Sequence, residues 1–257
     1  MARDTEISWT DHTINPWIGC VRVSRECQNC YAATIESRYK RAEWGKNAAR
    51  YHTKTAPKTA RKLNTAAQRE GVRKKIFCAS MSDFFEDNPQ VEQWRKEWWQ
   101  IIKECDSLDW LVLTKRSNKI AGFLPEDFTS GRFTHVNLGV SVGVASSTNR
   151  LDDLRALPDW GGLRWVSMEP LLESLAGVDL TRIDWAIVGG ETTVGNGFTQ
   201  MQETWVDEMK DACAKYGATF FFKQTSGRNG TTLKTFRGVQ YYDFPNFRFS
   251  LPVISAV

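Results

Sequence analysis

The sequence predicts an α/β protein with a parallel (β/α) barrel, closed or partly open and TIM-barrel-like. Six short runs rich in Val, Ile, Leu and Phe do not alternate strictly with polar residues, which is typical of strands covered on both faces. Helical patterns separate these runs, and a charged or hydroxyl residue stands at the C-terminal side of each. The runs are 74–80, 109–114, 135–142, 163–168, 184–190 and 218–224.

The segments between the runs are long enough for the helices that parallel strands require. Residues 91–105 place apolar side chains along one helical stripe, and residues 204–217 begin at the N-cap candidate Thr204 and end with glycine. The connections 115–134 and 143–162 each have room for a helix. One more strand is expected just before the first cysteines. No glycine-rich fingerprint follows it, which favours a barrel over an open doubly wound sheet.

Residues 1–257 are predicted to form a single domain, with a basic helical insertion at about 38–75 and a C-terminal extension at about 225–257. The basic segment holds thirteen Lys or Arg residues and two acidic residues, a net charge of +11 in a chain whose total is +4. Such a segment indicates contact with a polyanion, usually a nucleic acid, and its aromatic residues could stack on bases. A solvated surface that only maintains solubility explains the composition equally well.

The composition is that of an ordinary globular protein, with 41% hydrophobic and 25% charged residues. There is no run of eighteen or more apolar residues, so no membrane span is expected. The N-terminus lacks the basic and then apolar order of a secretory signal, so the chain is expected in the cytoplasm. Thiols stay reduced there, and clustered cysteines then indicate metal ligands or catalytic groups rather than disulfides.

Three cysteines, Cys20, Cys27 and Cys30, stand close together without a fourth nearby. A structural zinc site normally has four protein ligands, and His12 could complete a Cys3His set. An iron–sulfur cluster held by three thiolates would instead leave one iron open to a small chelating molecule such as S-adenosylmethionine (SAM). Both possibilities stay open on spacing alone. The isolated cysteines are predicted to be core residues: Cys78, Cys105 and Cys213.

Seven stretches, in chain order, carry a resemblance to a known family: "SWTDHTINPWIGCVRVSRECQNCYA", "SMSDFFED", "WLVLTKRSNKI", "NLGVSV", "LRWVSMEPLL", "WAIVGGET" and "ATFFFKQ". The chain resembles a phage-associated protein family of unassigned function that is similar to the radical SAM superfamily. Most of that superfamily has a C-x3-C-x2-C loop, whereas the first gap here is six residues. The resemblance implies a radical-SAM-like (β/α) barrel with a [4Fe–4S] cluster and SAM as cofactors.

The resemblance also implies roles for individual residues. The cluster would be held by Cys20, Cys27 and Cys30. SAM would be contacted by Tyr31, Ser80, Asp83, Ser141, Gly189 and Gly190. The catalytic residues would be Asp83, Glu169, Glu191 and Lys223. A phosphate or carboxylate of the substrate would be bound by Lys115, Arg116 and Lys223.

The function implied is that of a radical SAM enzyme (isomerase, lyase or transferase) that modifies a nucleobase or nucleotide. In phage DNA hypermodification, it could rearrange an amino-acid group attached to thymine. The basic segment 38–75 would bind the DNA, a flavodoxin or ferredoxin would donate electrons, and the site of action would be the host cytoplasm. The alternatives are a zinc-dependent barrel hydrolase or nuclease, and a non-catalytic nucleic-acid-binding protein with a structural cysteine–metal site.

Overall fold

A seven-stranded parallel sheet forms the centre of the computed structural model, which describes residues 5–193, 197–228 and 230–247. The order of the strands in the sheet is their order along the chain, and every neighbouring pair is parallel. All six predicted strands are confirmed, together with the additional strand before the cysteines. The strands are β1 (His12–Ile14), β4 (Lys74–Cys78), β5 (Leu108–Thr114), β6 (Val136–Ser141), β7 (Arg164–Met168), β8 (Trp185–Gly189) and β10 (Thr219–Gln224).

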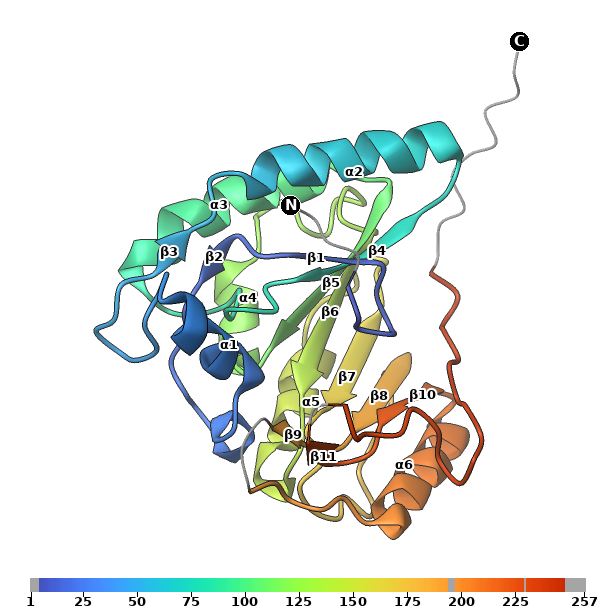
Figure 1. The fold of residues 1–257 in the computed structure, drawn as a ribbon. Coiled ribbons are helices and arrows are strands. Elements are labelled where there is room, and N and C mark those ends of the chain that lie inside the picture. The colour runs from blue at the N-terminus through green and yellow to red at the C-terminus, as the bar shows by residue number, and fades with distance from the viewer. Residues whose placement is uncertain (1–4, 194–196, 229, 248–257) are drawn as a thin grey trace.

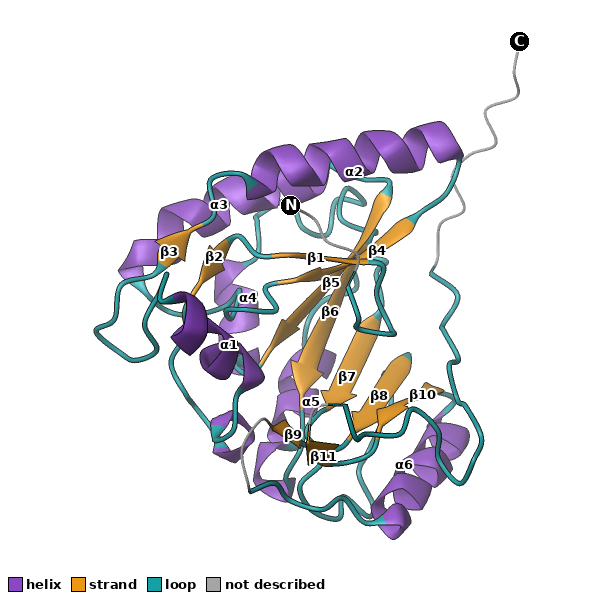
Figure 2. Cartoon of the chain, in the orientation of Figure 1, coloured by secondary structure: helices purple, strands orange, loops and turns teal. Residues whose placement is uncertain are grey.

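Because the strand order never reverses, the crossovers pass on one side of the sheet and their helices cover its outer face (Figure 1). The sheet curls into a half-barrel whose edges are β1 and β10, and these two strands are not paired within the described residues (Figure 2). A parallel α/β fold is confirmed, in its partly open form. The crossover helices are α2 (Ala56–Glu70), α3 (Pro89–Glu104), α4 (Ile120–Phe123), α5 (Asn149–Arg155) and α6 (Glu203–Tyr216).

Helix α2 corrects the predicted boundaries of the basic insertion. It is the crossover between β1 and β4, packed against both strands and against α3. Three small residues of α2 at helical spacing, Ala56, Ala60 and Ala67, form its buried face. The Lys and Arg residues of the helix line the opposite face. The sequence prediction missed this role because the basic composition of the segment obscured a narrow alanine stripe. Only the part of the segment before α2 is additional to the half-barrel.

The remaining elements are short and lie mostly around the carboxyl ends of the strands (Figure 1). Helix α6 begins one residue before the predicted N-cap Thr204, so that part of the prediction was wrong, and it ends as expected at Gly217, which has a left-handed φ of 75°. No helix in the described part of the chain is both long and apolar enough to cross a membrane. The short elements are β2 (Trp17–Ile18), η1 (Arg25–Cys27), α1 (Tyr31–Tyr39), β3 (Tyr51–His52), η2 (Ser117–Lys119), η3 (Ala145–Ser147), β9 (Thr192–Thr193) and β11 (Gly227–Arg228).

Two apolar clusters pack on the two faces of the sheet, because successive strand residues point to opposite faces. The larger one lies under the helices and contains the three isolated cysteines, which are at most 2% exposed, as predicted for core residues. The smaller one fills the inner face with aromatic rings, among them Trp9, Trp165 and Trp185. Gly139 makes room for this aromatic layer, since a Cβ there would lie 2.3 Å from Trp165 Cε2.

The C-terminal extension docks on the last strand of the sheet. Phe221 and Tyr242 form an antiparallel bridge, and their rings stack with centroids 4.6 Å apart. Trp185 Nε1 donates to the carbonyl of Asp243 at 3.1 Å, which ties the extension to the aromatic layer. The extension predicted at about 225–257 therefore pairs antiparallel with β10 in its described part, and residues 248–257 lie outside the described part.

Candidate functional site

Five of the predicted site residues share the inner face of the half-barrel at the carboxyl ends of the strands. The parallel register pairs Leu113 with Gly139 and Ser141 with Ser167. Residues two positions further along a strand lie on the same face. The polar residue two positions after an inner-face residue therefore also faces inward. The carboxyl ends of parallel strands are where α/β barrels carry their sites. The five residues are Lys115, Ser141, Glu169, Gly189 and Lys223.

These side chains contact one another in two pairs. Lys115 Nζ donates to Ser141 Oγ at 3.1 Å. Lys223 Nζ lies 2.8 Å from Glu169 Oε1 as an ion pair without hydrogen-bond alignment, and Ser167 Oγ donates to Oε2 of the same carboxylate at 3.4 Å. The Glu169 and Lys223 side chains are only 12% and 24% exposed, so water screens their attraction less than that of a surface pair. Two predicted catalytic residues are thus brought together.

The glycines that follow β8 have a steric role in this arrangement. A Cβ on Gly189 would lie 2.7 Å from Glu169 Oε1, and one on Gly190 would lie 2.2 Å from Ser226 N. Both distances are shorter than a Cβ atom tolerates: at Gly190 the obstacle is backbone, so glycine is needed there, whereas a Cβ at Gly189 would displace the Glu169 carboxylate. Their predicted contact with SAM stays a prediction.

Asp83 is buried and accepts hydrogen bonds on both carboxylate oxygens. Oδ1 accepts from Thr114 Oγ1 at 2.6 Å and from the backbone N–H of Phe85 at 3.0 Å. Oδ2 accepts from the backbone N–H of Lys115 at 3.1 Å and from Arg116 Nη1 at 2.8 Å. The carboxylate therefore orients Arg116 at the end of β5, and its predicted catalytic and SAM-binding roles stay predictions.

Arg116 connects this network to the cysteine loop, by which we mean residues 20–31. Its Nη2 donates to the carbonyl of Val21 at 2.9 Å, and its Nη1 lies 3.6 Å from Cys20 Sγ. Burial, reinforced by the nearby Asp83 carboxylate and opposed by Arg116, raises the pKa of Cys20 to about 12. The predicted substrate-binding residue Arg116 thus lies beneath the cysteine loop, where its side chain is 11% exposed.

The other end of the cysteine loop is tied to two further strand ends. Tyr31 donates its hydroxyl to the carbonyl of Ser80, after β4, at 2.9 Å. Asn29 Nδ2 donates to Glu191 Oε1, after β8, at 3.1 Å. The second oxygen of Glu191 accepts from the backbone N–H of Thr199 at 2.8 Å. Three residues predicted from the sequence, Tyr31, Ser80 and Glu191, therefore take part in these contacts, and their predicted roles in binding and catalysis stay predictions.

Glu26 ties the middle of the loop to the end of β6, and sequence reasoning missed it. Its Oε1 accepts from Arg150 Nη1 at 2.9 Å and from the backbone N–H of Gly143 at 3.3 Å. Burial alone would raise the pKa of Glu26, but hydrogen bonds from Ser24 and from its own backbone, together with the Arg150 charge, lower it to about 2. The sequence offered one signal for it, because Glu26 stands between the predicted metal ligands Cys20 and Cys27. A Glu side chain is almost never buried without a partner, so a Glu in such a loop predicts an ion pair.

The three loop cysteines are free thiols and each is half-buried. They fit an iron–sulfur cluster in donor type and in position, because the loop that carries them contacts four strand ends. In the part of the chain that the structure describes, no three His, Cys, Asp or Glu side chains are gathered closely enough to hold a metal ion, so the thiols would have to move together to bind one. The alternative Cys3His set with His12 is likewise not assembled there.

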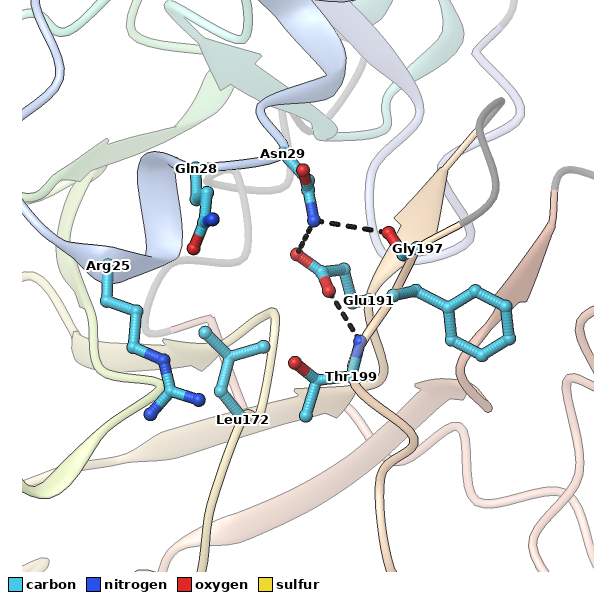
Figure 3. Close-up of a pocket in the computed structure, with 8 residues that line it drawn as sticks. Arg25, Gln28, Asn29, Leu172, Glu191, Gly197 and Thr199 are labelled. Atoms are coloured by element: carbon cyan, nitrogen blue, oxygen red, sulfur yellow. Dashed lines mark hydrogen bonds between the residues drawn. The ribbon is translucent and has the colours of Figure 1, made fainter.

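A polar cavity of about 320 Å³ opens between the cysteine loop and the segment after β9 (Figure 3). Arg25, Gln28 and Asn29 line it from the loop side, and Glu191 and Thr199 from the opposite side. Leu172 and Phe198 give it an apolar patch. Of the predicted site residues, Glu191 alone is among the described residues that line this cavity, which is large enough for part of a nucleoside.

The basic segment divides into paired and unpaired cations. Six of its thirteen Lys and Arg residues form ion pairs with acidic side chains, the most buried being Arg50 with Glu86 at 2.6 Å. The other seven have no acidic partner within the described residues and are exposed. They are Arg38, Lys40, Lys46, Lys54, Lys58, Lys62 and Arg69. The surface available to a polyanion is therefore narrower than the composition indicated.

The fold and the site together define a parallel α/β half-barrel with a cysteine loop across the carboxyl ends of its strands. Residues 4–240 match the model of the family described as "Protein of unknown function (DUF5131)", and the chain belongs to this family. No curated protein matches the chain, and no solved structure matches it.

Proposed function

We propose that this protein is a radical SAM enzyme that modifies a nucleobase or nucleotide, in phage DNA hypermodification. Cys20, Cys27 and Cys30 would hold a [4Fe–4S] cluster that, when bound, supplies an electron to SAM. The rearrangement of an amino-acid group on thymine is the concrete reaction we propose. The proposal extends the family assignment, which carries no function of its own.

One observation carries this proposal: the cysteine loop is tied to the carboxyl ends of β4, β5, β6 and β8 by separate side-chain contacts. Such ties are expected of a loop that must present its thiols to a site at the rim. A loop with a purely structural metal would need no contact with the polar strand ends. The proposal requires the loop to draw its three thiols together around the group that it binds.

The polar residues of the inner face suit the binding of a charged cofactor and substrate. Lys115 and Lys223 can each bind a carboxylate or phosphate, and Ser141 can accept or donate a hydrogen bond to a ribose hydroxyl. Glu169, which lies beside Lys223, can exchange a proton with a substrate. The aromatic layer below these residues excludes water from the inner face, which favours reactions that solvent would quench.

Iron and sulfide analysis after anaerobic reconstitution tests the cofactor proposal. We expect about four iron atoms per chain, as a [4Fe–4S] cluster requires, and a loss of most of them in Cys27→Ala. Cys105→Ala, in the apolar core, is the control and should keep its iron. Reduction with SAM present should then yield 5′-deoxyadenosine. Stoichiometric zinc in a colourless protein would support the zinc alternative instead.

The seven unpaired cations support the proposed DNA contact. Lys58 and Lys62 are exposed on one face of α2, four residues apart, and have no acidic partner among the described residues. Replacing both with Gln should reduce the slope of log affinity against log salt by about 1.8, since each lost phosphate contact accounts for about 0.9. Lys96→Gln, in an ion pair with Glu92 on α3, is the control. An unchanged slope would exclude α2 from the DNA interface.

A further inference from the structure

A charged residue is completely buried in the middle of the cysteine loop. Glu26 lies in the short helix η1, directly before Cys27, and its side chain is 0% exposed. Burying a carboxylate is costly unless charge and hydrogen bonds compensate for the lost water. Neighbouring residues of the same turn, Arg25 and Gln28, are exposed to solvent. The turn therefore had exposed positions for a charged side chain, and Glu26 occupies a buried one. This placement indicates a positional requirement.

The partners of Glu26 come from far along the chain and from a single place in the fold. Arg150, on α5, donates to Glu26 Oε1 at 2.9 Å and to the carbonyl of Ser141 at 2.6 Å through the same Nη1 nitrogen. The backbone N–H of Gly143 donates to the same carboxylate oxygen at 3.3 Å. The turn before Cys27 is thereby joined to the last residue of β6 and to the loop that follows it.

The backbone around this contact is shaped to admit Glu26. A Cβ on Gly143 would lie 3.0 Å from Glu26 Cγ and 2.0 Å from the carbonyl oxygen of Pro170. Only glycine therefore lets the turn and the segment after β7 approach β6 this closely. Arg25, on the same turn, pairs with Glu173 from the segment after β7, and this pair is different: the side chains are 52% and 36% exposed, and such pairs contribute little to stability.

We propose that Glu26 and Arg150 are a positioning pair that fixes the Cys27 turn at the carboxyl end of β6. The pair sets where the Cys27 thiol lies relative to Ser141 and its partner Lys115, while Arg116 does the same for Cys20 at the end of β5. The consequence for metal binding rests on the proposed function, but the contact itself can be tested in the metal-free protein. The two proposals can therefore fail separately.

The experiment measures the alkylation rate of each of the six cysteines in the reduced, metal-free full-length chain, by mass spectrometry after timed exposure to iodoacetamide. In Glu26→Gln, the Arg150 guanidinium loses its counter-charge without any change in side-chain size. We expect the Cys27 rate to rise about tenfold, as a local opening made about 1.4 kcal/mol easier would give. Glu173→Gln removes the counter-charge of Arg25 on the same turn, so it is the matched control and should change the rate less than about twofold.

The core cysteines separate positioning from general stability. Cys105 and Cys213 are buried under the helices, so their rates report opening of the whole domain. An unchanged Cys27 rate in Glu26→Gln would overturn the proposal, and so would a parallel rise at Cys105 and Cys213. If Glu26→Gln fails to fold, Arg150→Lys is measured in the same way. It keeps the charge on a shorter side chain without the planar guanidinium, so both contacts of Nη1 should weaken and the Cys27 rate should rise by a smaller factor.

Discussion

Replacing Gly189 with alanine is expected to destabilise the protein through the Glu169–Lys223 pair. The new Cβ would lie 2.7 Å from Glu169 Oε1, closer than Cβ atoms are found to approach other atoms. The carboxylate would have to retreat, and Lys223, 2.8 Å away, would have to follow or lose its partner. Overpacking of this kind costs about 1–3 kcal/mol. In a chain of this size each kcal/mol lowers Tm by about 2–4 °C.

A double-mutant cycle measured by urea unfolding isolates this contact. Glu169→Ala removes the atoms that the new Cβ would meet, so Gly189→Ala should cost less than about 0.5 kcal/mol in that background. Gly122→Ala is the control, since a Cβ there meets nothing within 4 Å and alanine favours its helix. If Gly189→Ala costs the same in both backgrounds, Glu169 does not lie over Gly189 and the described pair is wrong.

Three further predictions concern the packing and the charges around the site. Gly139→Ala should cost about 1–3 kcal/mol in urea unfolding, because its Cβ would overlap Trp165; an unchanged midpoint would contradict the aromatic layer. Burial lowers the pKa of His135 below its ordinary 6.5, so the unfolded chain binds more protons there and stability should fall as pH drops below 6.5. His135→Gln should remove that slope, at most about 1.4 kcal/mol per pH unit, in unfolding measured from pH 7 to 5. Arg50→Met should cost about 3–5 kcal/mol by leaving Glu86 buried without its counter-charge, and a second change, Glu86→Leu, should recover most of the loss; no recovery would show that the pair is not isolated.

The strands could be predicted because their signal is local. Each is a short run of Val, Ile, Leu, Phe or Trp covered on both faces, and such runs keep their character whatever they pair with. The polar strand ends could also be predicted, since period-two alternation extends the inner face of β6 and β7 to Ser141 and Glu169. A prediction of this kind depends on neither register nor curvature.

The pairing of site residues could not be predicted from the same pattern. Glu169 meets Lys223 across the intervening strand β8, and this depends on curvature and on the absence of a side chain at Gly189. Helix α2 was hidden for a related reason. Its buried stripe is made of alanines, whose apolar signal is weak beside the Lys and Arg residues on its other face.

The cysteine loop marks the boundary between what spacing can and cannot predict. The number and type of its sulfur ligands are local, and the sequence alone provides them. Whether the thiols converge depends on contacts that join residues far apart, such as Glu26 with Arg150, 124 positions away, and Cys20 with Arg116, 96 positions away. The two contacts tie different parts of the loop to different strand ends, so the sequence spacing of the cysteines does not determine how far apart their thiols lie. Replacing Arg150 or Arg116 should therefore disturb the conformation of the cysteine loop more than it disturbs the sheet.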